Sequence, residues 1–227
     1  MPEQSNIWVV IPAFNEGEVI RDVISELRKK YNNVVLVDDC SKDTTGSAAL
    51  DGGAIVLRHP INLGQGAALQ TGLKYAISQA AEYVVTFDAD GQHRVEDIAV
   101  LMEVQKQSNA DIVVGSRFLG STQNLPTLKK IVLKLAVLFT RMTSGLQLTD
   151  AHNGLRLFTG HAAKSIKINQ NRMAHASEIV DQILGLGLKV AEAPVTIIYT
   201  EYSIRKGQKI SNAFNILAEL FVGKITK

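Results

Sequence analysis

The sequence alternates between short apolar runs and longer stretches in which apolar residues recur every three or four positions. The apolar runs occupy residues 7–12, 34–37 and 83–87, and the helical spacing covers residues 19–27 and 67–77. The first pattern is typical of buried strands and the second of amphipathic helices. Strand–helix–strand units that repeat in this way predict an α/β fold, with a parallel sheet and right-handed crossovers.

The pattern loosens after about residue 114. The spacing there predicts, in order, a helix, a short strand, a helix, a strand pair and an amphipathic tail at residues 128–143, 155–158, 177–186, 189–199 and 211–227. A chain of 227 residues with an apolar fraction of 46% can fill one sizeable core. We therefore predict one domain over residues 1–227.

Three of the apolar runs end in polar loops that carry acids, at residues 13–16, 38–43 and 88–93. Ligands of open α/β sheets bind outside the carboxyl ends of the strands, so these loops should meet at one site. Asp88 and Asp90 stand two positions apart at the end of the third run. Such a pair suits Mg²⁺ or Mn²⁺, which takes oxygen ligands and often completes its shell with substrate phosphates. The alternative for the pair is a solvated turn.

Seven motifs in order resemble one known family. They read VIPAFNE at 10–16, VDDCSKD at 37–43, NLGQG at 62–66, DADGQH at 88–93, VGSRF at 114–118, DAHNGLR at 150–156 and RKGQK at 205–209. Together they resemble the family 2 inverting glycosyltransferases of GT-A fold, in the branch of dolichyl- or polyprenyl-phosphate mannose or glucose synthases. The resemblance implies a nucleotide-sugar-binding half at about 1–117 and an acceptor-side half with a helical extension at about 118–227.

The same resemblance implies the reaction and its partners. It implies a metal-dependent enzyme that moves a hexose from a nucleotide diphosphate sugar to polyprenyl phosphate. UDP, GDP and dTDP remain equally open as the donor nucleotide. One alternative is transfer to a soluble or glycan hydroxyl, and another is a noncatalytic subunit that binds sugar nucleotides.

The resemblance also implies which residues hold the donor. The predicted nucleotide-sugar contacts are Pro12, Asn15, Glu16, Asp38, Asp39, Gly64, Asp88, Ala89 and Arg205. Asn15 has a helix N-cap as its alternative role, and Gly64 has a tight turn. In relatives of this type the residue matching Asp90 binds the metal most directly. Asp88 and Gln92 complete the predicted metal ligands, and His93 is expected to be structural.

Three residues carry the predicted catalytic roles. Asp150 and Glu178 match family positions of acceptor-side carboxylates, and Asp150 is the preferred general base if the acceptor is a hydroxyl. A polyprenyl phosphate is already ionised, so these acids would then orient substrate; a structural role in the turn at 153–154 is the alternative for Asp150. Lys209 belongs to a basic loop that closes over the donor diphosphate in the branch. Here Gln208 replaces the usual serine.

Arg117 and Lys130 are the predicted contacts of the acceptor phosphate. The guanidinium of Arg117 matches a phosphate bidentately, and its alternative is a surface salt bridge. Lys130 shares a face of the predicted helix 128–143 with Lys134 and Arg141, which suits anionic lipid headgroups. A helix buried in a dimer is the alternative for this segment, so the oligomeric state stays open.

Composition and termini bear on partners and location. A net charge of +2 does not indicate nucleic acid, and we expect no such partner. Cys40 is the one cysteine, so no internal disulfide can form. Residues 2–4 do not resemble a basic signal-peptide start, and the most apolar stretch, residues 131–139, contains Lys134 and is far shorter than a membrane span of about 18 residues. We expect a cytoplasmic protein that can attach to the inner face of the membrane.

Overall fold

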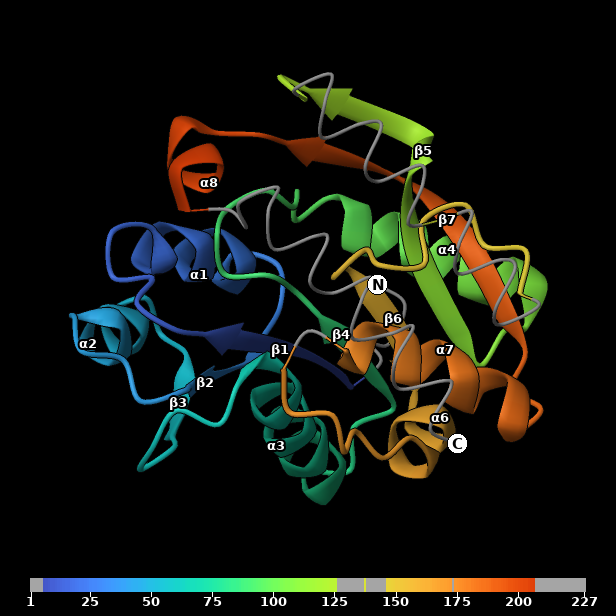
Figure 1. The fold of residues 1–227 in the computed structure, drawn as a ribbon, viewed down its shortest axis with the longest axis horizontal. Helices are drawn as coiled ribbons and strands as arrows, with labels where there is room; N and C mark the ends of the chain where they lie inside the picture. Colours follow the sequence, from blue (N-terminus) through green and yellow to red (C-terminus); the bar gives the residue numbers. More distant parts are fainter. Residues whose placement is uncertain (1–5, 126–136, 138–145, 173, 207–227) are drawn as a thin grey trace.

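The computed structural model describes residues 6–125, 137, 146–172 and 174–206. Seven strands form one sheet in the order β3-β2-β1-β4-β6-β5-β7 (Figure 1). The strands are β1 (Ile7–Ala13), β2 (Asn33–Asp38), β3 (Ile55–Arg58), β4 (Tyr83–Thr86), β5 (Ile112–Gln123), β6 (Arg156–Thr159) and β7 (Val190–Ile198). The helices are α1 (Ile20–Arg28), α2 (Thr45–Asp51), α3 (Gln65–Ser78), α4 (Asp97–Ser108), α6 (Gly160–Ser165), α7 (His175–Gly185) and α8 (Glu201–Lys206).

The predicted α/β fold with a mostly parallel sheet is confirmed. Strands β1 to β4 pair in parallel, as do β5 and β7. The predicted strand pair at 189–199 is wrong, because the segment forms the single strand β7, which lies beside β5 rather than folding back on itself. The predicted helix at 128–143, apart from residue 137, and the predicted tail at 211–227 lie outside the described residues.

Strand β6 is antiparallel to both of its neighbours, β4 and β5. Its first residue, Arg156, therefore pairs with Thr86 at the carboxyl end of β4 and with Val114 on β5. The loop that leads into β6 consequently lies at the edge where the parallel strands end. This inverted strand brings residues 150–155 to the edge that carries the acid-bearing loops.

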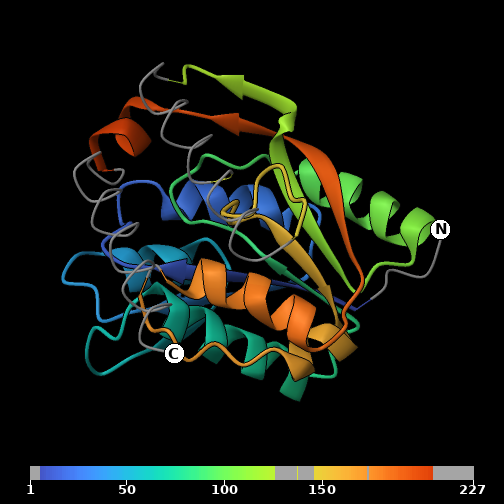
Figure 2. The same cartoon turned by 45° about the vertical axis from the view of Figure 1, so that its right-hand side comes forward.

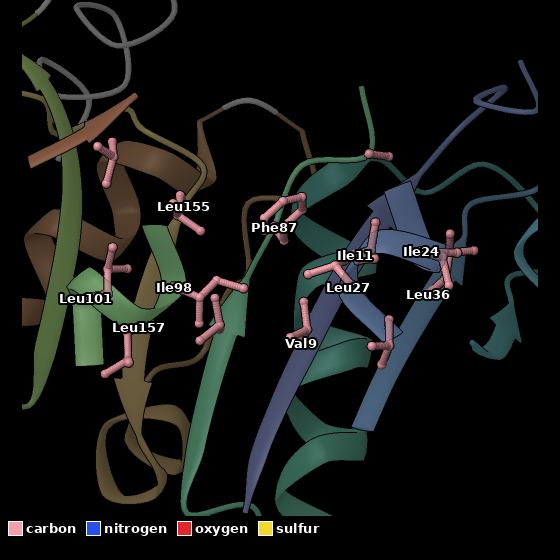
Figure 3. Packing of buried hydrophobic residues seen from close by; sticks show 14 of the residues in the cluster. Val9, Ile11, Ile24, Leu27, Leu36, Phe87, Ile98, Leu101, Leu155 and Leu157 are labelled. Atoms are coloured by element: carbon pink, nitrogen blue, oxygen red, sulfur yellow. The ribbon is translucent and has the colours of Figure 1, made fainter. Parts of the chain in front are cut away.

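Helices cover both faces of the sheet (Figure 2). On one face Val9, Ile11 and Leu36 pack with Ile24 and Leu27 of α1, and α4 continues the same cluster (Figure 3). On the other face the alternate residues of the strands pack against α3, α6 and α7. Strands with both faces buried read as continuous apolar runs, which explains the sequence pattern.

Helix α3 packs unusually close to the sheet. A Cβ atom at Gly72 would lie 2.2 Å from Val10 Cγ1, so a glycine is needed at this crossing. The close packing holds the N-terminus of α3, at Gln65, near the end of β4, where Gln65 Nε2 lies 3.4 Å from Asp88 Oδ1. Among the described helices, none is long and apolar enough to cross a membrane.

Candidate active site

Asp88 and Asp90 follow the end of β4 and are tied to their own loop. His93 Nε2 donates to Asp88 Oδ2 over 3.0 Å, and the backbone N–H of Gln92 donates to Asp90 Oδ1 over 3.1 Å. Gly154 closes the space beside Asp88, since a Cβ atom there would lie 2.0 Å from Asp88 Oδ2. The imidazole of His93 is buried and stacks edge-on against Phe87, so it has the structural contacts expected of it.

The two carboxylates influence each other's protonation. Burial raises the pKa of Asp90, and the negative charge of Asp88 raises it further. Burial alone would also raise the pKa of Asp88, but the hydrogen bond and charge of His93 and the charge of Arg156 hold it below its ordinary value. A cation bound by both carboxylates would reduce this repulsion and favour their ionised forms.

The donor set at this edge fits Mg²⁺ or Mn²⁺. The described residues hold no group of three histidine, cysteine or acidic side chains that could enclose a metal ion. A hard cation that keeps several waters and binds substrate phosphates needs only one or two carboxylates from the protein. Asp88 and Asp90 meet that requirement. The amide of Gln92 lies beside them, with its Nε2 hydrogen-bonded to Asp90 Oδ2 over 2.5 Å.

Arg156 is a buried cation that sequence reasoning did not single out. It is 4% exposed at the start of β6, and its Nη2 donates to Ala151 O over 3.0 Å. Burial lowers the pKa of Arg156 to about 10, while the charges of Asp88 and Asp150 act in the opposite direction. An arginine within the apolar run at residues 155–158 was the available signal, because charged residues are rarely buried unless paired.

The loop after β1 is tied to the loop after β2. Asn15 N donates to Ser41 Oγ over 2.9 Å, and Lys42 N donates to Asn15 Oδ1 over 2.8 Å. Helix α1 begins later, with Val19 at its N-cap, so the alternative of a helix cap at Asn15 is wrong. The side chain of Asn15 links two loops instead. The neighbouring Pro12 is buried within β1.

Asp39 connects the loop after β2 to the glycine loop before α3. Its carboxylate accepts hydrogen bonds from Leu63 N at 2.9 Å and Gly64 N at 2.7 Å, and His59 Nδ1 lies 2.7 Å away. Gly64 is the N-cap of α3 and has a φ of 104°, a backbone conformation that favours glycine. Asp38 is fully buried and accepts from Ser41 N over 2.8 Å. Contacts of these residues with a nucleotide stay predictions.

Helix α8 packs against the loop that carries Glu16. Lys206 Nζ lies 2.7 Å from Glu16 Oε1, and Tyr202 OH donates to Glu16 Oε2 over 2.7 Å. Burial raises the pKa of the Tyr202 phenol, and the Glu16 carboxylate raises it further. Arg205 lies on the outside, where it pairs with Glu18 over 2.8 Å. Lys206, which was not among the predicted site residues, thus forms an ion pair with Glu16.

Arg117 on β5 and Asp150 in the loop before β6 form a buried ion pair. Arg117 Nε donates to Asp150 Oδ2 over 2.6 Å, and Arg117 N donates to the same oxygen over 3.0 Å. Arg117 Nη1 donates to Tyr199 OH over 2.8 Å, and Asn153 Nδ2 donates to Asp150 Oδ2 over 3.1 Å. The side chains are 10% and 1% exposed, so the surface salt bridge considered for Arg117 is wrong.

A break in the strand pairing explains how Arg117 reaches this position. The β5–β7 register runs regularly to Ser116↔Pro194 and resumes only at Ser121↔Thr196. Such a bulge turns side chains and backbone groups out of the regular ladder. The N–H of Arg117 is therefore free to bond Asp150. Burial lowers the pKa of Arg117, but the charges of Asp150 and Tyr199 and the hydrogen bonds to both together hold that pKa above its ordinary value.

Glu178 lies in the first turn of α7 and has different partners. Its carboxylate accepts hydrogen bonds from Asn169 N, Asn169 Nδ2 and Gln170 N at 2.9 to 3.1 Å. These contacts hold the loop before α7, and its catalytic role stays a prediction. Ala89 is buried between the two aspartates. Lys130 and Lys209 lie outside the described residues.

The sequence was compared with known proteins. Residues 8–164 match the profile of Glycosyl transferase family 2. A UDP-N-acetylglucosamine–dolichyl-phosphate N-acetylglucosaminyltransferase of Methanococcus voltae is 33% identical, covering 97% of this chain and 97% of the relative. An undecaprenyl-phosphate mannosyltransferase of Micrococcus luteus is 30% identical, covering 86% of this chain and 84% of the relative.

Solved structures agree on the fold. The glucosyl-3-phosphoglycerate synthase of Mycobacterium tuberculosis, in complex with Mn²⁺, UDP-glucose and phosphoglyceric acid, superposes with a TM-score of 0.75 at 19% identity. The match covers 96% of this chain and 79% of that one. The protein therefore belongs to glycosyltransferase family 2 and is an enzyme of GT-A fold.

Proposed function

We propose that this enzyme transfers a hexose, with inversion, from a nucleotide diphosphate sugar to polyprenyl phosphate. The observation that carries the proposal is the position of two buried arginines, Arg117 and Arg156. They lie at the sheet edge that also bears the mutually repelling carboxylates of Asp88 and Asp90. Arg156 interacts electrostatically with both Asp88 and Asp150, so it links the Asp88–Asp90 carboxylates to the Arg117–Asp150 ion pair. Relatives that act on dolichyl or undecaprenyl phosphate support this choice of acceptor.

On the donor side, Asp88 and Asp90 would hold Mg²⁺ or Mn²⁺ against the diphosphate. The metal would neutralise the charge that develops on the departing nucleotide. Neighbouring structures contain Mn²⁺ with UDP-glucose, or Mg²⁺ with UDP, which supports a metal with this fold. The proposed nucleoside contacts lie at the ends of β1 and β2 and before α3, in Asn15, Glu16, Asp38, Asp39 and the Gly64 loop.

On the acceptor side, Arg117 would bind the acceptor phosphate with its remaining guanidinium N–H groups. A polyprenyl phosphate is already ionised, so the attacking oxygen needs no strong general base. Asp150 Oδ2 already accepts three hydrogen bonds, which leaves that oxygen poorly placed to take a proton. We therefore propose that Asp150 orients Arg117, and that hydroxyl acceptors are disfavoured.

A transfer assay tests this function directly. Purified protein is incubated with UDP-, GDP- and dTDP-hexoses, with Mn²⁺ or EDTA, and with farnesyl phosphate or a soluble monosaccharide as acceptor. We expect a metal-dependent glycosyl phosphate product of inverted anomeric configuration, read by NMR. Transfer to the monosaccharide with none to farnesyl phosphate would establish the hydroxyl-acceptor alternative. Nucleotide-sugar binding without any turnover would establish the noncatalytic one.

Membrane attachment is a separate part of the proposal. The predicted basic face of residues 128–143 supports contact with an anionic membrane surface at the cytoplasmic side. Co-sedimentation with anionic but not neutral liposomes, weakened by salt, is the expected result. Reversal of Lys130 and Lys134 to glutamate should abolish it. Equal recovery of the wild type in the supernatant with both liposome types would exclude this attachment.

A further inference from the structure

Glu192 on β7 binds the segment that carries Asp150. Its Oε1 accepts hydrogen bonds from Thr149 N at 2.8 Å, Thr149 Oγ1 at 2.8 Å and Asp150 N at 3.1 Å, and its Oε2 lies 2.9 Å from Thr149 N. Thr149 and Asp150 belong to no strand or helix, so their backbone N–H groups need such a partner. One carboxylate therefore fixes the backbone of two consecutive residues that lie 42 and 43 positions away in the chain.

The hydrogen bonds around Thr149 have a defined direction. An ionised carboxylate only accepts, so the hydroxyl of Thr149 donates its single hydrogen to Glu192. Ser116 Oγ lies 2.6 Å from Thr149 Oγ1 and must be the donor in that pair. Ser116 Oγ in turn accepts from Phe118 N at 3.3 Å and Leu119 N at 3.2 Å. A directed chain thus runs from the bulge of β5 through Thr149 to Glu192 on β7.

The same two segments are joined a second time by the ion pair. Arg117 follows Ser116, and Asp150 follows Thr149, so the hydroxyl contact and the ion pair are neighbouring links. Glu192 anchors one side of both links without a hydrogen bond or ion pair to Arg117 among the contacts of the described residues. If the backbone at 149–150 moved, Asp150 Oδ2 would move with it. The guanidinium of Arg117, which donates to this oxygen, would then lose its fixed orientation.

We infer that Glu192 is a positioning residue that sets the orientation of Arg117 toward the acceptor phosphate. The inference rests on the proposed function, in which Arg117 binds that phosphate. Bidentate recognition depends on the plane and direction of the guanidinium, and misplacement by about 1 Å can cost up to about 10²-fold in rate. Glu192 would thus affect acceptor use while the donor carboxylates, held by their own loop, stay in place.

Steady-state kinetics with farnesyl phosphate as the acceptor probe provide the first test. Glu192→Ala should raise KM for farnesyl phosphate by about tenfold. Glu192→Gln should have a smaller effect, because its carbonyl oxygen can keep the hydrogen bonds that Oε1 accepts, although its amide NH₂ cannot accept from Thr149 N as Oε2 does. Donor hydrolysis without acceptor should stay within about twofold of wild type in both variants. The matched control is Glu103→Gln on α4, an exposed residue whose carboxylate accepts from Gln107.

Two outcomes of the kinetics would overturn the inference. An unchanged KM for farnesyl phosphate in Glu192→Ala would show that Arg117 does not depend on this anchor. A parallel fall of acceptor use and donor hydrolysis would show a general structural role. Near-ultraviolet circular dichroism identifies variants that have lost their packing, and Glu192→Gln serves as the second variant if Glu192→Ala does not fold.

An NMR measurement decides the inference without catalysis. The Nε–H signal of Arg117 can be assigned by its loss in Arg117→Lys. We expect this signal to shift or broaden in Glu192→Ala and to stay unchanged in Glu103→Gln. An identical signal in wild type and Glu192→Ala would overturn the positioning role. If wild type transfers no sugar to farnesyl phosphate, the proposed function fails, and this measurement still decides whether Glu192 positions Arg117.

Discussion

Asp88 and Asp90, which we propose for the donor side, belong to one short loop, whereas the Arg117–Asp150 pair, which we propose for the acceptor side, requires segments far apart in the chain. The partners of Arg117 lie 33 and 82 residues away, while those that hydrogen-bond Asp90 and Asp88 from their own loop lie 2 and 5 residues away. The donor carboxylates are also more accessible, since the side chain of Asp88 is 32% exposed and that of Asp150 is 1% exposed. A local, open cluster can exchange ligands, and a distributed, buried pair can hold one orientation.

The comparison predicts that removing a donor carboxylate affects activity and not stability. Asp90→Ala should lower transfer by about 10³-fold or more, because it removes a carboxylate proposed to hold the metal that neutralises the departing diphosphate. The free energy of unfolding should stay within about 0.5 kcal/mol, since no core contact is lost. Transfer assays and urea unfolding measure both quantities. Wild-type turnover in this variant would remove Asp90 from the metal site.

The opposite result is expected for the acceptor pair. Asp150→Ala should lower the free energy of unfolding by about 3–5 kcal/mol, because it leaves the buried guanidinium of Arg117 without its counter-ion. The double variant Arg117→Met/Asp150→Ala removes both charges and should regain part of that stability. A double-mutant cycle in urea measures the coupling. Additive losses in the double variant would contradict a buried, coupled pair.

Gly154 tests whether the two sides depend on each other. Gly154→Ala places a Cβ atom 2.0 Å from Asp88 Oδ2 and must displace that carboxylate. We expect transfer to fall by about 10²-fold, with loss of metal-dependent nucleotide affinity by calorimetry. Gly185→Ala on α7 is the matched control, because its Cβ would meet nothing within 4 Å. Equal activity of both variants would show that Asp88 has room to move.

The loop of the acceptor pair should also make stability depend on pH. Burial, together with the charge of Arg156, lowers the pKa of His152 from 6.5 to about 4. The unfolded chain then binds a proton that the folded chain excludes, so this stability is present above pH 6.5 and is lost as pH falls toward 4. Its loss at pH 5 should be about 2 kcal/mol.

Urea unfolding at pH 7 and pH 5 measures this effect. His152→Gln should remove it, and His161→Gln, at an exposed position of α6, should retain it. An equal pH dependence in wild type and His152→Gln would show that His152 is protonated in the folded protein.

Much of the fold could be predicted because its signals are local. The apolar runs of β1, β2 and β4 have both faces buried, and the spacing in α1, α3 and α7 follows one helix face. The direction and place of β7 could not be predicted in the same way. Strand partners depend on contacts between distant residues, which periodicity does not encode.

For the site, the sequence by itself located the paired carboxylates that we propose for the donor side. Asp88, Asp90 and Gln92 lie within five residues of one another, and a strand end followed by a turn brings such residues together in any sheet of this kind. The signal for Arg156 was only a charge within an apolar run, and Glu192 had none, because their roles depend on partners from other segments.

Only the tertiary structure decided how the Arg117–Asp150 pair is assembled. The antiparallel insertion of β6 brings Asp150 to the active edge, and the bulge in β5 frees the N–H of Arg117 to meet it. The anchor at Glu192 comes from β7, which joins the sheet last in chain order. A buried charge is stable only when distant segments supply its partners together, and that condition is met by the assembled fold rather than by any one motif.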